Sequence, residues 1–156
     1  GKMLSPLLVK EVRKDGRVVE EFESKVVKSS LCGSETLEEI KTCLHDVVWD
    51  NQLGTASVNP WGTRKAQSGL VAIAGKTGTA QILEDGYQNT RHRMSFVGYF
   101  PEENPQYSCI CVIHGPQWPY DAGMDCGSVV RNIAEKTMAY KGEYVIRNGK
   151  LVMNVK

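Results

Sequence analysis

Alternating apolar and polar positions at the start of the chain predict a β-hairpin. Residues 7–12 and 17–22 are rich in valine and leucine, and the Asp15-Gly16 pair between them is typical of a tight turn. From about residue 35 the apolar positions take helical spacing, and Thr36 with Glu39 matches a capping box. The apolar positions of this predicted helix are Leu37, Ile40, Leu44, Val47 and Val48.

The middle of the chain predicts a loop followed by a buried strand. Residues 50–68 are polar, contain glycine and proline, and indicate a connection. Leu70 to Ala74 are apolar without alternation, which is typical of a strand buried on both faces. A turn at residues 84–86 lies within a polar stretch, residues 83–93, which indicates a long mobile connection.

Two further strands are predicted at residues 94–100 and 108–114, joined by a turn at Asn104-Pro105. Because both faces of residues 109–113 are apolar, we expect the second of these strands to be central, with helices covering both sides. The predicted fold class is therefore α+β, an antiparallel sheet with helices on both faces.

The C-terminal part of the chain predicts a helix from about Gly127 and then a short hairpin around Asn148-Gly149. The positions of this helix expected to face inward are Val129, Val130, Ile133 and Ala134. With no repeat and no low-complexity linker, residues 1–156 are expected to belong to a single domain.

The composition narrows the possible partners. Nineteen basic and eighteen acidic residues give a net charge of +1, which offers no electrostatic case for nucleic-acid binding. The small basic clusters Arg64-Lys65 and Arg91-His92-Arg93 are typical of solvated loops. No apolar run approaches the roughly 20 residues needed to cross a bilayer, and no signal peptide is visible.

Five cysteines, an odd number, leave at least one without an intramolecular partner. Cys109 and Cys111 share one face of a predicted strand, where disulfide geometry is rarely met, so packed free thiols are predicted. A zinc site formed by these two residues with His114 and Cys126 fits no standard ligand spacing. We therefore expect no metal and no cofactor.

The segment AGKTGTAQ, residues 74–81, has the residues best suited to chemistry. Strand periodicity places Thr77 and Thr79 on one side and Lys76 with Gly78 on the other. The segment combines an ammonium group, two hydroxyls and backbone amides that glycine leaves uncrowded. These groups are suited to binding an anionic, peptide-like ligand.

Two kinds of protein use Gly-Lys-Thr. A phosphate-binding loop is disfavoured, because Gly69 lies one residue too far from Gly75 and strand residues separate them. The other use is the Lys-Thr-Gly box of serine acyl-transferases that react with penicillin.

The flanking sequence favours the second use. Five segments follow one another along the chain in this order: GKMLSPLLVKEVRKDGRVVEEF, ETLEEIKTCLHDVV, GTA at 54–56, AGKTGTAQ and SFVGYFPEENPQYSCICVI. From Gly1 to about Tyr140 the chain resembles the C-terminal half of the transpeptidase domain of a class B penicillin-binding protein. This resemblance implies a penicillin-binding/β-lactamase-like fold, of which the chain is the C-terminal part.

The resemblance also implies a role for each residue of the triplet. Lys76 and Thr79 are expected to be catalytic: the charge of Lys76 assists proton transfer, and the backbone N–H of Thr79 is one of two oxyanion-hole donors. Lys76 and the hydroxyl of Thr77 are expected to bind the terminal carboxylate of the substrate, and Gly78 to leave room for its backbone. All four residues are thus expected to be substrate-binding.

The family's nucleophile is the serine of a Ser-x-x-Lys element, and none of the ten serines here is followed by lysine three residues later. We expect the nucleophile to lie outside this chain and the fragment alone to be inactive. Ser57-Val58-Asn59 matches the family's Ser-x-Asn element, but so short a pattern often arises by chance, so Ser57 is not assigned.

The predicted function is peptidoglycan D,D-transpeptidation, with D-Ala-D-Ala stem peptides and β-lactams as ligands. Two alternatives stay open: a D,D-carboxypeptidase or serine β-lactamase, and a non-catalytic penicillin sensor or scaffold. The resemblance further implies a membrane anchor outside this chain, a catalytic domain on the periplasmic side and partners in the division machinery. Surfaces normally covered by the rest of the domain predict self-association.

Overall fold

The computed structural model describes residues 1–84, 87–116, 120–140, 144–147 and 150–153. It divides into two compact units, residues 1–40 and 41–156, which we describe separately. The expectation of a single domain stays a prediction.

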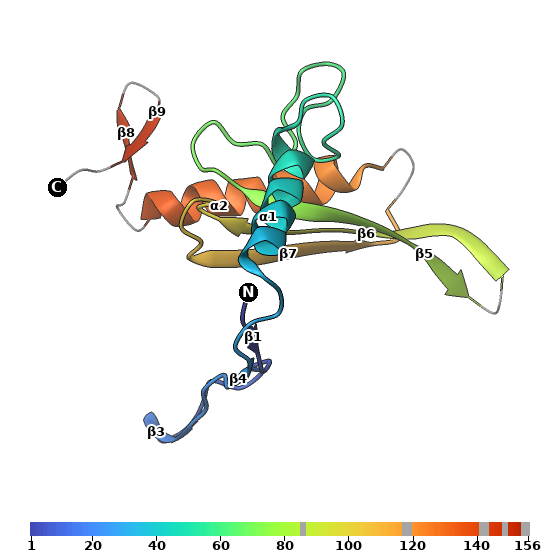
Figure 1. The fold of residues 1–156 in the computed structure, drawn as a ribbon. Coiled ribbons are helices and arrows are strands. Elements are labelled where there is room, and N and C mark those ends of the chain that lie inside the picture. The colour runs from blue at the N-terminus through green and yellow to red at the C-terminus, as the bar shows by residue number, and fades with distance from the viewer. Residues whose placement is uncertain (85–86, 117–119, 141–143, 148–149, 154–156) are drawn as a thin grey trace. The chain divides into compact units, whose positions relative to one another are not determined.

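The first unit contains two short antiparallel strand pairs (Figure 1). β1 (Met3–Leu4) pairs with β4 (Val26–Lys28), and β2 (Glu11–Lys14) pairs with β3 (Arg17–Glu21). The predicted hairpin is confirmed, because both residues of the Asp15-Gly16 turn adopt the positive φ that tight hairpin turns require. The pairing is shorter than predicted, since β2 begins at Glu11.

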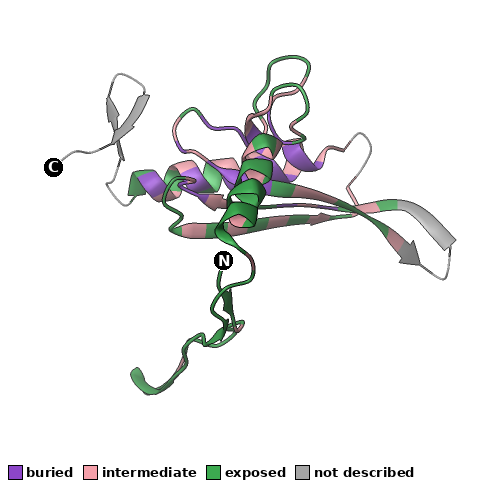
Figure 2. Cartoon of the chain, in the orientation of Figure 1, coloured by how far each residue is buried: buried purple, intermediate pink, exposed green. Residues whose placement is uncertain are grey.

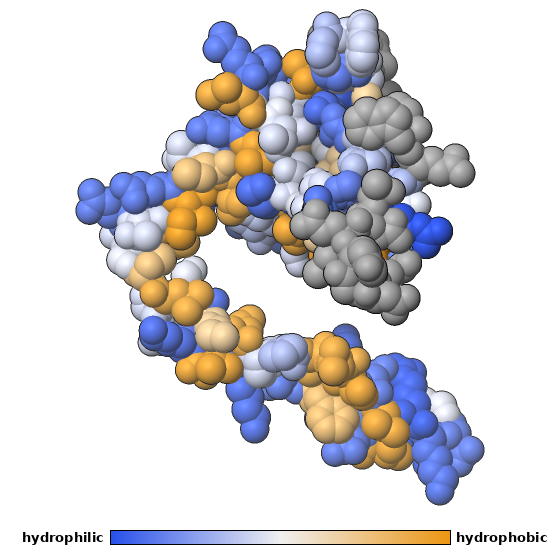
Figure 3. All heavy atoms as spheres, turned by 90° about the vertical axis from the view of Figure 1, so that its right-hand side faces the viewer, coloured by the Kyte–Doolittle hydropathy of each residue, from blue (hydrophilic) through white to orange (hydrophobic). Residues whose placement is uncertain are grey.

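Apolar side chains of the first unit are largely exposed (Figures 2 and 3). Leu8 is 95% exposed, and the two faces of the β2–β3 pair differ little in burial. Two-stranded ribbons bury too little surface to form a core of their own. The backbone hydrogen bonds of its two strand pairs are therefore its main tertiary contacts.

Helix α1 (Ser34–Trp49) confirms the predicted helix. The capping box is wrong: Thr36 lies inside the helix, and the first turn closes through the Leu37 N–H to the Gly33 carbonyl, 3.1 Å. The last turns are anchored within the second unit, because the Trp49 indole N–H donates to the Ile73 carbonyl and His45 bonds to Glu102.

The second unit contains a three-stranded antiparallel sheet in the order β5-β6-β7 (Figure 1). Its strands are β5 (Ala74–Glu84), β6 (Tyr87–Phe100) and β7 (Tyr107–His114). The described residues 83–84 and 87–93 are not a loose connection: they continue the β5–β6 pairing, with Glu84 opposite Tyr87 and Gln81 opposite His92. The predicted turn at residues 84–86 lies partly outside the described residues. Polar composition misled the prediction, because antiparallel pairing is made by backbone groups and tolerates polar side chains.

The strand predicted to begin at Leu70 begins instead at Ala74. The preceding backbone bonds to other groups: the N–H groups of Leu70 and Val71 donate to the Ser68 hydroxyl, and the Ala72 carbonyl accepts from Glu102. The burial was predicted correctly, since Val71 and Ile73 are at most 2% exposed. Apolar runs indicate burial more surely than they indicate strand pairing.

A short π-helix, η1 (Gly123–Gly127), leads into helix α2 (Ser128–Tyr140). The buried stripe of α2 is Val130, Ala134 and Met138, at a spacing of four residues. The predicted inward positions Val129 and Ile133 are wrong, because these side chains are 40% and 42% exposed. The strands of the predicted C-terminal hairpin are present as β8 (Tyr144–Arg147) and β9 (Lys150–Met153), and Asn148-Gly149 lies outside the described residues.

The core of the second unit joins one face of the sheet to η1, α2, the end of α1 and the loop before β5 (Figure 2). Its fully buried large side chains include Ile73, Met94, Phe96, Phe100, Val130 and Met138. The α+β class with an antiparallel sheet is confirmed. None of the described helices is both long and apolar enough to span a bilayer.

The prediction that the third strand is central, with helices on both faces, is wrong for the described part of the chain. β7 lies at the sheet edge, and its outward side chains Ile110 and Val112 are 64% and 51% exposed. An apolar face becomes buried only when another segment covers it, and no described residue covers this one.

Candidate active site

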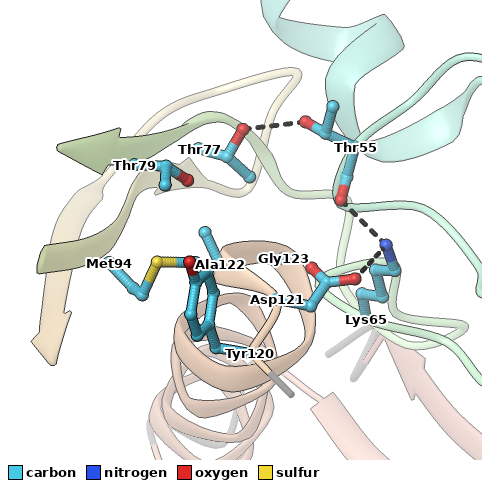
Figure 4. Close-up of a pocket in the computed structure, with 9 residues that line it drawn as sticks. All are labelled: Thr55, Lys65, Thr77, Thr79, Met94, Tyr120, Asp121, Ala122 and Gly123. Atoms are coloured by element: carbon cyan, nitrogen blue, oxygen red, sulfur yellow. Dashed lines mark hydrogen bonds and ion pairs between the residues drawn. The ribbon is translucent and has the colours of Figure 1, made fainter. Parts of the chain in front are cut away.

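A pocket of about 310 Å³ lies beside the KTG strand (Figure 4). Three segments of the second unit contribute to it: β5 and β6, the loop after α1, and the segment that leads into η1. Its lining residues are Thr55, Lys65, Thr77, Thr79, Met94, Tyr120, Asp121, Ala122 and Gly123.

The two threonines of β5 lie on the same side of the strand. Thr77 and Thr79 are paired with Phe96 and Met94 of β6, whose side chains belong to the buried face. Lys76 is paired instead with Val97, on the exposed face, and is not among the lining residues. The two-residue alternation predicted from the sequence therefore holds in the structure.

Strand alternation also decides where the backbone groups point. In an antiparallel ladder each residue directs its N–H and C=O to one neighbouring strand, and the next residue directs them to the other. The carbonyl of His92 on β6 accepts from the Gly115 N–H, on the β7 side. Every second residue of β6 from His92 onward therefore directs its backbone groups to β7. Val97 lies five residues after His92, so its backbone groups point to β5.

Because Val97 is paired with Lys76, the backbone of Lys76 faces β6, and that of Thr77 and Thr79 faces away from it. β5 has no strand on that side in the described sheet, so these N–H and C=O groups lie at an open edge. The Lys76 ammonium donates to the Thr77 carbonyl at this edge, at 2.9 Å. The side chains of Lys76 and Thr77 thus leave opposite faces of β5, while the Lys76 ammonium reaches the Thr77 carbonyl at the open edge.

The glycines of β5 permit close packing against β6. A Cβ on Gly78 would lie 2.5 Å from the Ser95 hydroxyl, and one on Gly75 would collide with the Val97 carbonyl. The Gly75 contact is with backbone, so β5 requires glycine at this position, whereas rotation of the Ser95 side chain would relieve the contact at Gly78.

The loop after α1 brings Thr55 to the KTG strand. The Asp50 carboxylate accepts from the N–H groups of Gln52 and Leu53, and the Gly54 N–H donates to the Asp50 carbonyl. A Cβ on Gly54 would collide with that carbonyl. The turn therefore places Thr55 so that its hydroxyl lies 2.8 Å from that of Thr77.

Ser57, the first residue of the Ser-x-Asn match, has a structural role. Its hydroxyl donates to the Gly54 carbonyl at 2.9 Å, and the residue is 1% exposed. Asn59 accepts from the N–H groups of Trp61 and Thr63 within its own turn. Neither residue lines the pocket.

An ion pair forms the wall opposite Thr77. The Lys65 ammonium lies 2.7 Å from the Asp121 carboxylate and donates to the Thr55 carbonyl at 3.1 Å. Its side chain is only 12% exposed, so the prediction of a solvated loop lysine is wrong. Burial alone would raise the pKa of Asp121, but the hydrogen bond and charge of Lys65, with backbone N–H donors, hold that pKa below its usual value.

The start of η1 is fixed by reciprocal hydrogen bonds. The Asp121 carboxylate accepts from the Met124 N–H at 3.0 Å, and the Asp125 carboxylate accepts from the Asp121 N–H at 2.9 Å. Gly123 is required here, because a Cβ would collide with the Thr55 carbonyl and lie 3.0 Å from the Lys65 chain. The loop and the helix start are thus in direct contact.

Tyr120 and Met94 complete the pocket. The Tyr120 hydroxyl lies 2.6 Å from Nδ1 of His92, and the two rings are 4.8 Å apart. His92 is therefore a partner of the pocket wall, which its place in a basic cluster did not indicate. Met94 is 2% exposed and closes the pocket against the core.

Sequence reasoning missed seven of the nine lining residues, among them Thr55, Lys65, Tyr120, Asp121 and Gly123. The GTA triplet at 54–56 is part of the family resemblance, and it is the sequence feature that indicates a role for Thr55. The other four carry no local signature, because their partners are distant in the sequence. Within the described residues, no group of three or more His, Cys, Asp or Glu side chains is placed to hold a metal ion.

Comparisons with known proteins identify the family of this chain. The family described as the penicillin binding protein transpeptidase domain matches residues 1–139. The chain belongs to this family. The class B resemblance inferred from the sequence is thereby confirmed.

Two curated relatives carry the name peptidoglycan D,D-transpeptidase FtsI homolog. That of Mesostigma viride is 35% identical over 120 residues, which cover 75% of this chain and 18% of the relative. That of Chlorokybus atmophyticus is 32% identical over 110 residues, covering 69% of this chain and 15% of the relative. The chain thus spans less than a fifth of the length of these two relatives.

The solved structure of penicillin-binding protein 2X from Streptococcus thermophilus shares the fold. It is similar with a TM-score of 0.70 and 23% identity, over 91% of this chain and 21% of that protein.

Proposed function

We propose that this chain forms the KTG wall of the active site of a peptidoglycan D,D-transpeptidase. The observation that carries the proposal is the open edge of β5, where the backbone of Thr77 and Thr79 lies free of β6 beside a pocket. Extended peptides bind such edges by adding a strand. Membership of the transpeptidase family makes a stem peptide ending in D-Ala-D-Ala the expected occupant.

In this proposal each residue of the triplet has one role. The Lys76 ammonium favours the carboxylate of the terminal D-Ala and assists proton transfer, and the Thr77 hydroxyl donates to that carboxylate. Gly78 leaves room for the ligand backbone. The Thr79 N–H donates to the oxyanion, a contact whose loss costs about 3–4 kcal/mol of transition-state stabilisation.

The nucleophile is proposed to be a serine outside these 156 residues, because no serine here precedes a lysine by three positions. That serine attacks the carbonyl of the penultimate D-Ala and expels the terminal D-Ala. The amine of a second stem peptide then displaces the serine. β-Lactams acylate the same serine.

The setting of the whole protein follows from the same proposal. We place it at the cytoplasmic membrane, anchored by a segment outside this chain, with its catalytic domain on the periplasmic side and division-machinery proteins as partners. The exposed side chains Val97, Ile110 and Val112 lie where further polypeptide is expected to pack, so we also propose that the chain alone self-associates.

The first test uses the 156-residue chain with a fluorescent penicillin. We expect no covalent adduct by intact-protein mass spectrometry, because the nucleophile is missing. An acyl mass shift on this chain would refute the assignment of the nucleophile to another segment.

The second test uses the longer polypeptide that carries this chain together with a Ser-x-x-Lys element. Lys76→Ala is expected to slow penicillin acylation by about two to three orders of magnitude. Lys136→Ala, on an exposed position of α2, is the matched control and should acylate at the wild-type rate. Equal rates in the two variants would remove Lys76 from the mechanism.

A turnover assay with a stem-peptide substrate separates the remaining candidates. Cross-linked product is expected. Hydrolysis alone would identify a carboxypeptidase, and hydrolysis of the penicillin itself a β-lactamase. Stable acylation without turnover of either substrate would identify a sensor.

A further inference from the structure

A row of polar contacts links the segment before η1 to the KTG strand (Figure 4). The Asp121 carboxylate lies 2.7 Å from the Lys65 ammonium, and this ammonium donates to the Thr55 carbonyl at 3.1 Å. The Thr55 hydroxyl lies in turn 2.8 Å from that of Thr77. The surroundings of the Thr77 hydroxyl are therefore set by groups that lie outside β5.

The two threonine hydroxyls share one hydrogen bond, so only one of them is its donor. A hydroxyl carries a single proton and accepts through its lone pairs. If Thr77 donated to Thr55, its proton would not be available to the carboxylate of a bound ligand. Thr77 can therefore donate to that carboxylate only while Thr55 is the donor in the shared bond.

We propose that Thr55 and Lys65 are positioning residues for this contact, an inference that rests on the proposed function of Thr77. Thr55 donates its proton to the Thr77 oxygen, and Thr77 donates its own proton to the ligand carboxylate. Consecutive hydrogen bonds polarise and strengthen one another, and a charged final acceptor strengthens them further. In this arrangement neither Thr55 nor Lys65 touches the ligand.

Lys65 acts through the backbone of Thr55. Its side chain is only 12% exposed, and its ammonium joins the Thr55 carbonyl to Asp121. Asp121 is itself held by hydrogen bonds with Met124 and Asp125 at the start of η1. The ammonium thus has a fixed anchor on one side, and its removal is expected to loosen the loop that carries Thr55.

The positioning role predicts a preference for ligands with a free carboxylate. The Thr55 proton helps only when Thr77 donates to a charged acceptor, so an uncharged ester gains less from the pair. A purely structural role for Thr55 would instead affect the acid and the ester equally. The ratio of the two acylation rates therefore separates positioning from structure.

The test uses the longer polypeptide that carries this chain together with a Ser-x-x-Lys element, acylated by benzylpenicillin or by its methyl ester. Thr55→Val should lower the acid-to-ester ratio of rate constants about three- to tenfold, because it removes the donor and keeps the side-chain shape. Thr55→Ser retains the hydroxyl and should restore the wild-type ratio. An unchanged ratio in Thr55→Val, including an equal loss of rate with both ligands, would overturn the proposal.

Thr63→Val is the matched control for Thr55→Val. Thr63 is an exposed threonine of the same loop that does not line the pocket, so the ratio should stay at the wild-type value. Circular dichroism checks that each variant is folded. A fall in the ratio as large as that of Thr55→Val would contradict the specific role of Thr55.

The contribution of Lys65 is tested with a double-mutant cycle. Lys65→Met should lower the ratio in the same direction but by less, because the Thr55 hydroxyl remains. The variant with both Thr55→Val and Lys65→Met should show the ratio of Thr55→Val alone, since Lys65 acts through Thr55. Effects that multiply would show that the Lys65 charge acts on the ligand directly, which would refute its positioning role.

Lys76→Ala distinguishes failure of this inference from failure of the proposed function. If Lys76→Ala slows acylation while Thr55→Val leaves the ratio unchanged, only the positioning role is wrong. If Lys76→Ala acylates at the wild-type rate, the proposed function of the KTG wall is wrong, and the positioning role is overturned with it.

Discussion

The two faces of the three-stranded sheet are built from alternate residues of the same strands, yet they differ sharply. On one face Met94, Phe96 and Phe100 are at most 2% exposed and pack against η1 and α2. On the other, Val97 and Ile110 are 47% and 64% exposed. The covered face supports the pocket wall with Thr77 and Thr79, while the open face presents Lys76. The described chain thus completes one side of its candidate site and leaves the other uncovered.

The largest expected effect comes from breaking the covered face. Phe96→Ala should lower the free energy of unfolding by about 3–5 kcal/mol, because it removes a fully buried ring from a packed core. Val97→Ala, the next residue on the open face, should lower it by less than about 1 kcal/mol. Urea denaturation followed by circular dichroism measures both. Similar losses for the two variants would contradict the contrast between the faces.

A second prediction concerns the contact between η1 and the Thr55 loop. Gly123→Ala should destabilise the chain by about 1–3 kcal/mol and separate the pocket walls, because its Cβ would collide with the Thr55 carbonyl. Gly69→Ala is the matched control, since its Cβ would meet only the tip of the flexible Arg64 side chain. Equal thermal stability of the two variants would show that the loop yields freely at Gly123.

A third prediction concerns pH. The pKa of Asp121 is held below its ordinary value of 3.8, so its contribution to stability is present above that pH and is lost as pH falls through the lower folded-state pKa. Asp121→Asn should cost about 1 kcal/mol at pH 7 and less at pH 2. Denaturation curves at both pH values provide the measurement. A loss that stays constant between them would exclude the Lys65–Asp121 pair as its source.

The smallest effect on stability is expected on the open face. Ile110→Lys should change the free energy of unfolding by less than about 0.5 kcal/mol, since the side chain is already 64% exposed. It should nevertheless weaken self-association, because a charge then interrupts the apolar face. Sedimentation velocity over a range of concentrations tests this. A wild-type chain that is monomeric at all concentrations would show that this face is not an association surface.

Local pattern predicted the elements whose geometry depends on near neighbours. Helix α1, the Asp15-Gly16 turn and the alternation of Lys76 with Thr77 follow from spacing within a few residues. Predictions that needed to know what covers a segment were less successful. The apolar residues of β7 indicated two buried faces, but one of these faces is exposed. The polar composition of residues 83–93 indicated a loop, but residues 87–93 belong to β6, which pairs with β5.

The sequence by itself determined the KTG strand and the family to which it belongs, because a short run of residues carries both. Only the tertiary structure decided that Lys65 pairs with Asp121, that Thr55 meets Thr77 and that Tyr120 meets His92. These partners lie 22 to 56 positions apart, and each side chain alone is an ordinary polar residue. Their meeting depends on how the loop after α1 and the start of η1 pack on the sheet. That packing is set by the combined burial of many residues, which no local pattern contains.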